Sequence, residues 1–353
     1  MLVERVAAAE QSLIRLELAG AMVPSLDRLI YAFVRKEAVL SSQIEGTQAT
    51  LMDLLNHEAG PKTSSTPPNA DVEEVCNYLD ALTYARQQLS DSGGLPLSMR
   101  LLNNTHRILL RGTRGANKLP GEIRQSQNWI GGSRPGNASF VPPPPNLLPG
   151  LLSDLERFVH ANGSLPAVAR AGLLHGQFES IHPYLDGNGR IGRLLVTLLL
   201  EHWGQLSRPL LYLSLFFKRH RREYYRRLDA VRVQGDWEGW LDFFLDGVAT
   251  IADEAVDTAQ ALFALVAADR ARLLRQPGVT LLAVQLFERL PGRPIVSAPW
   301  VVEALSTSKP TAGRAIEALV GAGVLVETTG KKRDRSYAYQ AYLDRLRAGT
   351  ELD

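Results

Sequence analysis

Apolar residues recur at three- and four-residue spacing along most of this 353-residue chain, and this spacing constrains the fold more than any other feature. It places apolar side chains on one face of a helix, whereas a half-buried strand would show strict alternation. We therefore expect a mainly α protein, and the length suggests two or three units. The predicted helical segments are two helices within 25–58, then 70–90, 96–111, 166–180, 189–203 and further helices from 214 to 275.

Two segments between these helices differ in composition. "GPKTSSTPPN", residues 60–69, is typical of a linker. "LPGEIRQSQNWIGGSRPGNASFVPPPP", which begins at Leu119, is rich in glycine, proline and β-forming residues. It predicts a small β-hairpin at about 121–133, followed by an extended proline segment.

The last 80 residues change character. "VTLLAVQLFERLPG", "APWVVEALS" and "TAGRAIEALVGAG" predict three short helices, and "VLVETTGKKRDRSYAYQ" predicts two strands joined by a basic turn. Three helices with a β-wing indicate a winged helix-turn-helix. We therefore divide the chain into an N-terminal helical segment (1–65), a core (66–265) and a winged helix-turn-helix domain (270–353).

Composition excludes several classes of protein. Hydrophobic residues make up 45% of the chain and the net charge is +2, which is typical of a globular protein and not of a disordered one. The single cysteine, Cys76, excludes an internal disulfide framework and fits a reducing compartment. The start, "MLVERVAAAEQ", lacks a signal-peptide pattern, and the longest apolar run is far short of the roughly 20 residues that span a membrane. We expect a cytoplasmic protein with no membrane partner.

The charge is unevenly distributed. From Arg270 onward, 13 Lys and Arg stand against 8 Asp and Glu, a net charge of +5, while the remainder carries −3. A basic tail on a mildly acidic body suggests nucleic-acid binding for the tail only.

A polar turn, "SIHPYLDGNGRIGR" at 180–193, lies between two apolar helices. The piece "GNGRIG" fits the dinucleotide-binding pattern G-x-G-x-x-G, but no strand precedes it. "DGNG" begins like a calcium loop, but Arg190 and Thr197 stand where carboxylates are needed. Both interpretations are therefore excluded.

The same turn has the features of an anion site. Gly187 and Gly189 permit positive φ, so backbone N–H groups can point inward, and the unpaired amides of the following helix face the loop. This arrangement suits phosphate. Arg190 and Arg193 are neighbours on one helix face and can hold further phosphates.

Two more residues of the turn can do chemistry on a bound phosphate. Asp186 is placed to hold a Mg²⁺ that bridges phosphate oxygens, and His182 can take a proton from an attacking hydroxyl. Together they indicate nucleotidyl or phosphoryl transfer. The alternative is a capped turn with solvated arginines and a structural histidine.

The segment "HPYLDGNGRIGR" resembles the signature of the Fic (filamentation induced by cAMP) family, HPF-x-[DE]-GNGR-x-x-R. Tyr184 departs from it, standing where phenylalanine is usual. "GEIRQSQNWIGG", "FVPPPP" and "ARAGLLHGQFESIHP" are also similar in order and spacing, so the resemblance covers about 25–250. It implies a Fic-type helical core with a small β-hairpin flap, and a winged helix-turn-helix is a common companion.

The resemblance implies a protein adenylyltransferase (AMPylator), which transfers AMP from ATP to a Ser, Thr or Tyr hydroxyl of a target protein or of itself. The flap near 121–133 would align the target segment by strand addition. The roles implied for the turn are general base for His182, Mg²⁺ ligand for Asp186, an anion hole around the α- and β-phosphates for Gly187, Asn188 and Gly189, and β- and γ-phosphate contacts for Arg190 and Arg193.

"SSQIEG", residues 41–46, has two interpretations. Ser42-x-x-Glu45 fits a capping box at a helix start. The stretch also resembles the Fic inhibitory motif [S/T]-x-x-x-E-[G/N], through Ser41, Glu45 and Gly46. We favour inhibition, in which Glu45 pairs with Arg193 and blocks the γ-phosphate. In some relatives the same glutamate positions water to remove AMP, so removal is a further expectation.

The tail has candidate nucleic-acid contacts on a predicted recognition helix and on the wing. DNA binding and a fold reused for homodimerisation or target docking both stay open. The residues are Lys309, Thr311 and Arg314 on the helix and Lys331, Lys332, Arg333 and Arg335 on the wing.

Two other functions remain alternatives to the self-inhibited adenylyltransferase. One is a DNA-binding regulator whose nucleotide site is only a sensor, and the other is a Fic-type phosphotransferase with reversed substrate orientation. A sensor needs no base such as His182. The phosphotransferase fits poorly with Arg193 and the inhibitory motif, which suit an inward γ-phosphate.

Overall fold

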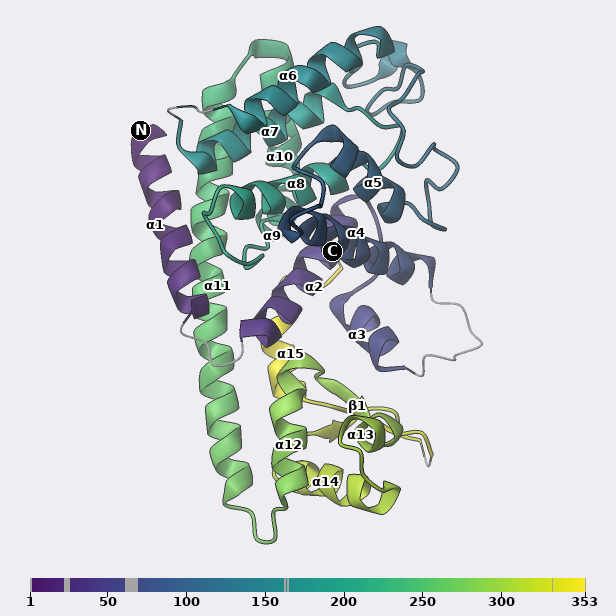
Figure 1. Ribbon diagram of the computed structural model, residues 1–353, viewed down its shortest axis with the longest axis vertical. Coiled ribbons are helices and arrows are strands. Elements are labelled where there is room, and N and C mark those ends of the chain that lie inside the picture. The colour runs from purple at the N-terminus through teal and green to yellow at the C-terminus, as the bar shows by residue number, and fades with distance from the viewer. Residues whose placement is uncertain are drawn as a thin grey trace.

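The computed structural model describes residues 2–21, 26–60, 69–161, 163, 165–331 and 333–352. These residues form a helical body above a smaller tail that contains a three-stranded sheet (Figure 1). The helices of the body are α1 (Leu2–Ala21), α2 (Leu26–Ile44), α3 (Leu51–Ala59), α4 (Ala70–Ser90), α5 (Met99–Leu109), α6 (Leu148–His160), α7 (Ala167–Ile181), α8 (Asn188–His202), α9 (Ser214–Arg219), α10 (Arg221–Gln234) and α11 (Trp237–Leu274). The mainly α prediction is confirmed, and each predicted helical segment has its counterpart.

Helices α7 and α8 form the centre of the body. Both are buried on nearly every side, which explains why apolar residues make up much of their sequences. Glycines in α7 allow the neighbouring helix α11 to approach closely: a Cβ at Gly172 would lie 2.7 Å from Phe244, and one at Gly176 would lie 2.9 Å from Trp240. The polar turn connects α7 to α8, so the core fixes both ends of the turn.

The 38-residue helix α11 runs from the body into the tail (Figure 1). Helix α1 lies along it and is joined to it by ion pairs of Arg5 with Asp242 and Asp246, and of Arg15 with Asp253. These pairs are partly exposed, so each contributes little stability, and the apolar face of α1 makes the larger contribution.

The tail consists of α12 (Leu281–Arg289), β1 (Ile295–Ser297), α13 (Ala298–Ala304), α14 (Lys309–Gly321), β2 (Val326–Glu327), β3 (Ser336–Ala338) and α15 (Gln340–Leu346). The strands form an antiparallel sheet in the order β1-β3-β2. Three helices with a two-stranded wing match the order expected of a winged helix-turn-helix. The strand β1 and the final helix α15 had no counterpart in the sequence prediction, because three apolar residues and one short helix give too weak a periodic signal.

The β-hairpin expected at about 121–133 is reduced and lies later in the chain. A single antiparallel bridge joins Ile130 to Phe140, with a 3-10 turn (η1, Pro135–Asn137) between them. Positive φ at Gly131 and Gly132 bends the chain out of a strand directly after the bridge. Most of the predicted linker 60–69 lies outside the described residues. Among the described helices, none combines the length and apolar character needed to cross a membrane.

Candidate active site

The turn from His182 to Gly187 is held in an unusual backbone conformation at both ends. His182 follows the last residue of α7 and is left-handed, with φ 49° and ψ 63°, while Gly187 precedes α8 with φ 76°. A left-handed non-glycine residue costs free energy and persists only where its surroundings impose it. The turn therefore depends on contacts that pin His182 in place.

Arg124 supplies those contacts. Its Nε donates to the carbonyl oxygen of His182 at 2.9 Å, and its Nη2 donates to the oxygens of Ile181 and, at 2.5 Å, Pro143. Its Nη1 donates to Ser126 O at 3.3 Å. The side chain is buried, and all four of these acceptors are backbone oxygens. Arg124 thus satisfies carbonyls at the end of α7 and ties them to both ends of the segment 126–143.

Tyr184, the departure from the Fic signature, is accommodated by specific partners. Its hydroxyl donates to Asn103 Oδ1 at 2.8 Å, and its ring stacks on His106 with centroids 3.9 Å apart. Asn188 fixes the same residue through its backbone, accepting from Tyr184 N and donating to Tyr184 O. These two bonds fix the orientation of the amide side chain, and the backbone N–H of Asn188 opens the first turn of α8.

His106 holds the turn from the side of α5. Its Nδ1 accepts from Gly121 N at 2.8 Å, so the neutral ring carries its proton on Nε2 and donates it to Asp186 O at 2.9 Å. Burial lowers the pKa of His106 to about 4, so the ring stays uncharged at neutral pH. Neither His106 nor Arg124 was singled out from the sequence, since both act on residues more than 50 positions away.

The first turn of α8 presents unpaired amides. Its first intrahelical bond runs from Ile191 N to Gly187 O, so the N–H groups of Asn188, Gly189 and Arg190 have no helical acceptor. The expectation of positive φ is met at Gly187 only, and Gly189 lies within the helix. Glycine is needed at 189 for a different reason: a Cβ there would overlap Glu45 Oε1.

Glu45 therefore lies against the start of α8 and pairs with Arg193. Arg193 Nη2 donates to Glu45 Oε1 at 2.6 Å and to Ser41 O at 2.9 Å, while its Nε donates to Ser41 Oγ at 2.9 Å. Burial acts to raise the pKa of Glu45, but the charge and hydrogen bond of Arg193, together with the charge of Arg190, hold that pKa below its usual value. A protein carboxylate thus already lies against the anion site predicted from the sequence, with Gly46 following at φ 96°.

The capping-box interpretation of Ser42-x-x-Glu45 is wrong. Ser42 lies in the last turn of α2, which ends at Ile44, so no helix begins there. The capping box of α3 is formed by Thr50 and Asp53 instead.

Arg190 and Asp186 are the remaining charged residues of the turn. Arg190 is buried and pairs weakly with Glu74 Oε2 at 3.4 Å and with Asp186 Oδ1 at 3.6 Å. Asp186 keeps a side chain that is one third exposed, and its Oδ1 accepts from Gly187 N at 2.6 Å. Asp186 is the accessible carboxylate of the turn.

The ring of His182 is uncharged at neutral pH. Burial is the main reason that its pKa falls to about 4, and the positive charge of Arg232 acts in the same direction. Its imidazole is therefore neutral at physiological pH, the form that a general base requires.

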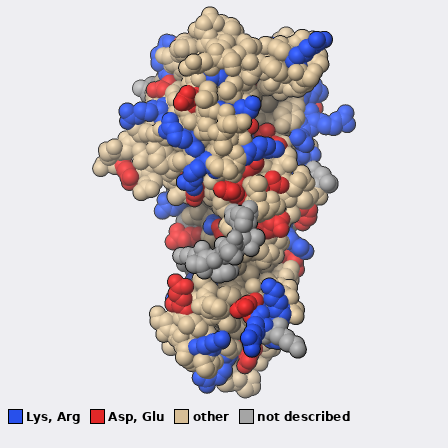
Figure 2. Space-filling view, turned by 90° about the vertical axis from the view of Figure 1, so that its right-hand side faces the viewer, with Lys and Arg blue, Asp and Glu red and all other residues tan. Residues whose placement is uncertain are grey.

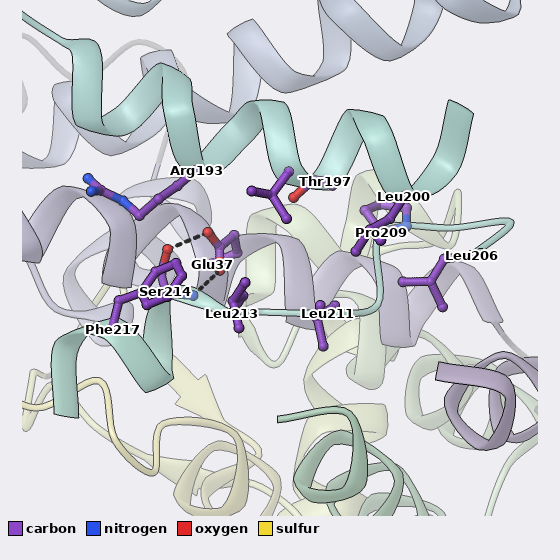
Figure 3. A pocket seen from close by; sticks show the side chains of 11 residues that line it. Glu37, Arg193, Thr197, Leu200, Leu206, Pro209, Leu211, Leu213, Ser214 and Phe217 are labelled. Carbon is purple, nitrogen blue, oxygen red and sulfur yellow. Dashed lines mark hydrogen bonds between the residues drawn. The ribbon is translucent and has the colours of Figure 1, made fainter. Parts of the chain in front are cut away.

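Arg193 also lines a small cavity of about 10 Å³ beneath α8, opposite Glu37 (Figure 3). Glu37 accepts from Ser214 N at 3.0 Å and from the Ser214 hydroxyl, and burial raises its pKa to about 7. The cavity has room for about one water. It is too small for a nucleotide, so Glu37 is best understood as an anchor that holds α2 to α9.

The candidate nucleic-acid residues lie on the tail, away from the turn. Lys309 and Arg314 are exposed on α14, and Thr311 bonds to Ser308 through its hydroxyl. Lys and Arg side chains gather beside a few acidic ones on the tail face in Figure 2. On the wing, Lys331, Arg333 and Arg335 are exposed, while Lys332 lies outside the described residues.

Two sequence models of one family match the chain. The Fic/DOC family N-terminal model matches residues 3–87, and the Fic/DOC family model matches residues 96–200. Together they cover more than half of the chain.

Curated relatives are similar over shorter stretches. A probable protein adenylyltransferase of Aquifex aeolicus is 37% identical over 70 residues, which are 20% of this chain and 22% of that protein. Protein adenylyltransferase Fic of Culex quinquefasciatus is 34% identical over 128 residues, which are 36% of this chain and 23% of that protein. The chain thus aligns with less than a quarter of the length of these relatives.

Solved structures share the fold. A Fic family protein of Desulfovibrio desulfuricans G20 superposes with a TM-score of 0.61 at 22% identity, over 96% of this chain and 95% of that one. Fic-1 of C. elegans superposes with a TM-score of 0.53 at 20% identity, over 74% and 73%. At these identities the likeness establishes the fold alone.

We expect Arg124→Ala to lower the free energy of unfolding by about 2–4 kcal/mol, because it leaves several buried carbonyls without a donor. Arg157→Ala, which removes an exposed arginine of α6, should change it by less than about 0.5 kcal/mol. Urea unfolding followed by circular dichroism measures both. Equal stability of the two variants would contradict the role assigned to Arg124.

We expect the imidazole of His182 to be still neutral at pH 5, since its pKa is about 4. An ordinary histidine, with a pKa of about 6.5, is almost fully charged at that pH. Proton–carbon NMR of the histidine rings, with His182→Ala to assign the signal, makes the measurement. A charged His182 ring at pH 6 would refute the prediction.

Proposed function

Because the chain belongs to the Fic/DOC family, we propose that it is a self-inhibited protein adenylyltransferase. It transfers AMP from ATP to a Ser, Thr or Tyr hydroxyl of a target protein or of itself. The observation that carries the proposal is the position of Glu45: a carboxylate against the unpaired amides of α8, paired with Arg193. An anion of the protein stands where a phosphate would bind.

The residues of the turn divide the binding of the triphosphate. The N–H groups of Asn188 and Gly189 hold the α- and β-phosphates, aided by the positive end of the α8 dipole. The N–H of Gly187, the third residue of the expected anion hole, is bonded to Asp186 Oδ1 and joins them only when that bond opens. Arg190 contacts the β-phosphate and Arg193 the γ-phosphate, both as charge-assisted donors. Glu74 keeps Arg190 oriented toward the turn.

His182 acts as general base. The hydroxyl oxygen of the target attacks the α-phosphorus while its proton passes to His182. The bond between the α-phosphorus and the oxygen that bridges to the β-phosphate breaks, and pyrophosphate leaves. The target keeps the AMP through its former hydroxyl oxygen. Arg124 holds the base through its backbone carbonyl, so the geometry of attack depends on a residue outside the turn.

Asp186 fits a Mg²⁺ that is shared with the substrate. Among the described residues, no group of three or more His, Cys, Asp or Glu side chains could hold a metal by itself. Mg²⁺ commonly binds through one carboxylate together with substrate phosphates and water, and Asp186 offers that carboxylate. When bound, the ion would neutralise phosphate charge.

Glu45 inhibits by competing for Arg193. A charge-assisted pair of this kind contributes about 1–3 kcal/mol. While it stands, the γ-phosphate loses its guanidinium donor and meets a negative charge, so ATP binds in a non-productive position. We assign this lock to the segment 1–65 and catalysis to 66–265. Within the latter, we assign docking of the target to the flap near 121–133.

We expect Glu45→Gly to gain the mass of one AMP on incubation with ATP and Mg²⁺ about 5- to 150-fold faster than the wild type, since the lock contributes about 1–3 kcal/mol. Glu45→Gln, which keeps the shape and loses the charge, should fall between them. Intact-mass spectrometry measures the gain, and Glu45→Gly with His182→Ala should show none. If no variant gained mass and no protein of a lysate were labelled, the proposal would fail.

We propose separately that the tail binds duplex DNA through the exposed cations of α14 and the wing. Phosphate contacts of this kind release counterions, so the affinity should fall steeply between 50 and 200 mM salt, with a slope of about −0.9 per contact. Fluorescence anisotropy with a random-sequence duplex measures it for the wild type, for Lys331→Glu with Arg333→Glu, and for Arg157→Glu as control. Absence of binding at low salt, or equal weakening by the control, would exclude this activity.

A further inference from the structure

The last described residues of the chain return from the tail to the body. We call residues 347–352 the C-terminal strap; they follow α15 and pass beside α2, where Figure 1 marks the C-terminus. Thr350 is buried at the centre of the strap, with its N–H and hydroxyl bonded to Arg347 O at 2.8 and 2.7 Å. This burial shows that the strap is docked against its neighbours.

The strap bonds directly to the inhibitory motif. Gln43, the middle residue between Ser41 and Glu45, donates through Nε2 to Thr350 O at 2.9 Å. The same nitrogen donates to Ala49 O at 2.9 Å, which closes the turn that follows Glu45. Gln43 is itself buried, so loss of the strap would leave a buried amide with one acceptor fewer.

Gly349 seats the strap against α9. It has φ 82°, and a Cβ there would lie 2.6 Å from Leu215 Cδ1. Lys218, also on α9, donates to Glu351 O on the other side of Thr350. The close contact with Leu215 and the positive φ therefore favour glycine beside Thr350, whose carbonyl oxygen lies opposite Gln43.

The tail also contacts the elements on both sides of the motif. Arg28 of α2 pairs with Glu288 of α12 at 3.5 Å, and Arg293 donates to Glu58 O at the end of α3 at 2.7 Å. Strand β1 packs against α3. The segment that carries Glu45 is thus bracketed by contacts from one domain.

We propose that the strap is a second element of the lock: it holds the segment 41–47 so that Glu45 stays on Arg193, and its release frees the site. The expected effect on catalysis rests on the proposed function. The expected effect on the segment 41–47 depends only on the contacts between that segment and the strap. Through the strap, a change in the position of the tail would shift Glu45 without any direct contact between the tail and the turn at 182–193.

Gly349→Ala tests the strap by adding a methyl group where Leu215 leaves no room and a positive φ disfavours it. Gly323→Ala is the matched control, because Gly323 has φ 66° in the same domain with nothing within 4 Å. A chain that ends at Leu346, the last residue of α15, removes the whole strap and tests the case in which the substituted strap only shifts.

The first readout is hydrogen exchange of the amides of Glu45, Gly46 and Thr47, which bond to Ser42 O and Gln43 O. Gly349→Ala and the truncated chain should exchange these amides about tenfold faster than the wild type, while Gly323→Ala should not. Unchanged exchange in both strap variants would overturn the proposal, whatever the activity of the protein.

The second readout is the rate of AMP gain by intact mass. Each strap variant should gain AMP at least about threefold faster than the wild type. Combined with Glu45→Gly, it should not raise the rate above that of Glu45→Gly alone, because the strap acts through Glu45. A further increase in that background, or no increase over the wild type, would overturn the proposal. If Glu45→Gly alone gained no AMP, the proposed function would fail while the exchange result would still decide the strap.

Discussion

The contact between Glu45 and Arg193 is the interaction on which the rest of the site depends. It joins the end of α2 to the first turns of α8, two elements 148 positions apart in sequence. Much of the surrounding structure serves that contact: Ser41 orients the guanidinium, Gly189 leaves space for the carboxylate, and Glu37 anchors α2 to α9. A buried guanidinium needs a counter-charge. Glu45 supplies that counter-charge to Arg193, the residue proposed to bind the γ-phosphate.

The sequence was most informative where the chemistry is local. The turn at 180–193 contains its own glycines, its own helix start and a histidine, so an anion site could be predicted from fourteen residues. Helix positions followed in the same way from apolar spacing. The inhibitory stretch was harder, because "SSQIEG" is compatible with a helix start as well as a helix end, and only the fold places Ser42 in the last turn of α2.

What the sequence could not provide was the set of residues that act at a distance. His106 and Glu74 stand in no local pattern, and Arg124 lies in a stretch that was noted only for its resemblance to Fic proteins. Each of the three nevertheless holds a group of the turn. The expected hairpin also failed as a regular element, since its glycines end the pairing after one bridge. Tyr184 shows the same dependence: the hydroxyl that departs from the family signature is matched by Asn103, from a helix about 80 positions earlier.

Helix α11 has a consequence for geometry. A continuous helix of 38 residues is about 57 Å long at a rise of 1.5 Å per residue, and it behaves as a rod rather than a hinge. The tail is therefore joined to the body by a stiff helix as well as by its direct contacts with α2 and α3. Movement of the tail against the body would therefore have to come from loss of its contacts with α2 and α3, and not from bending of α11.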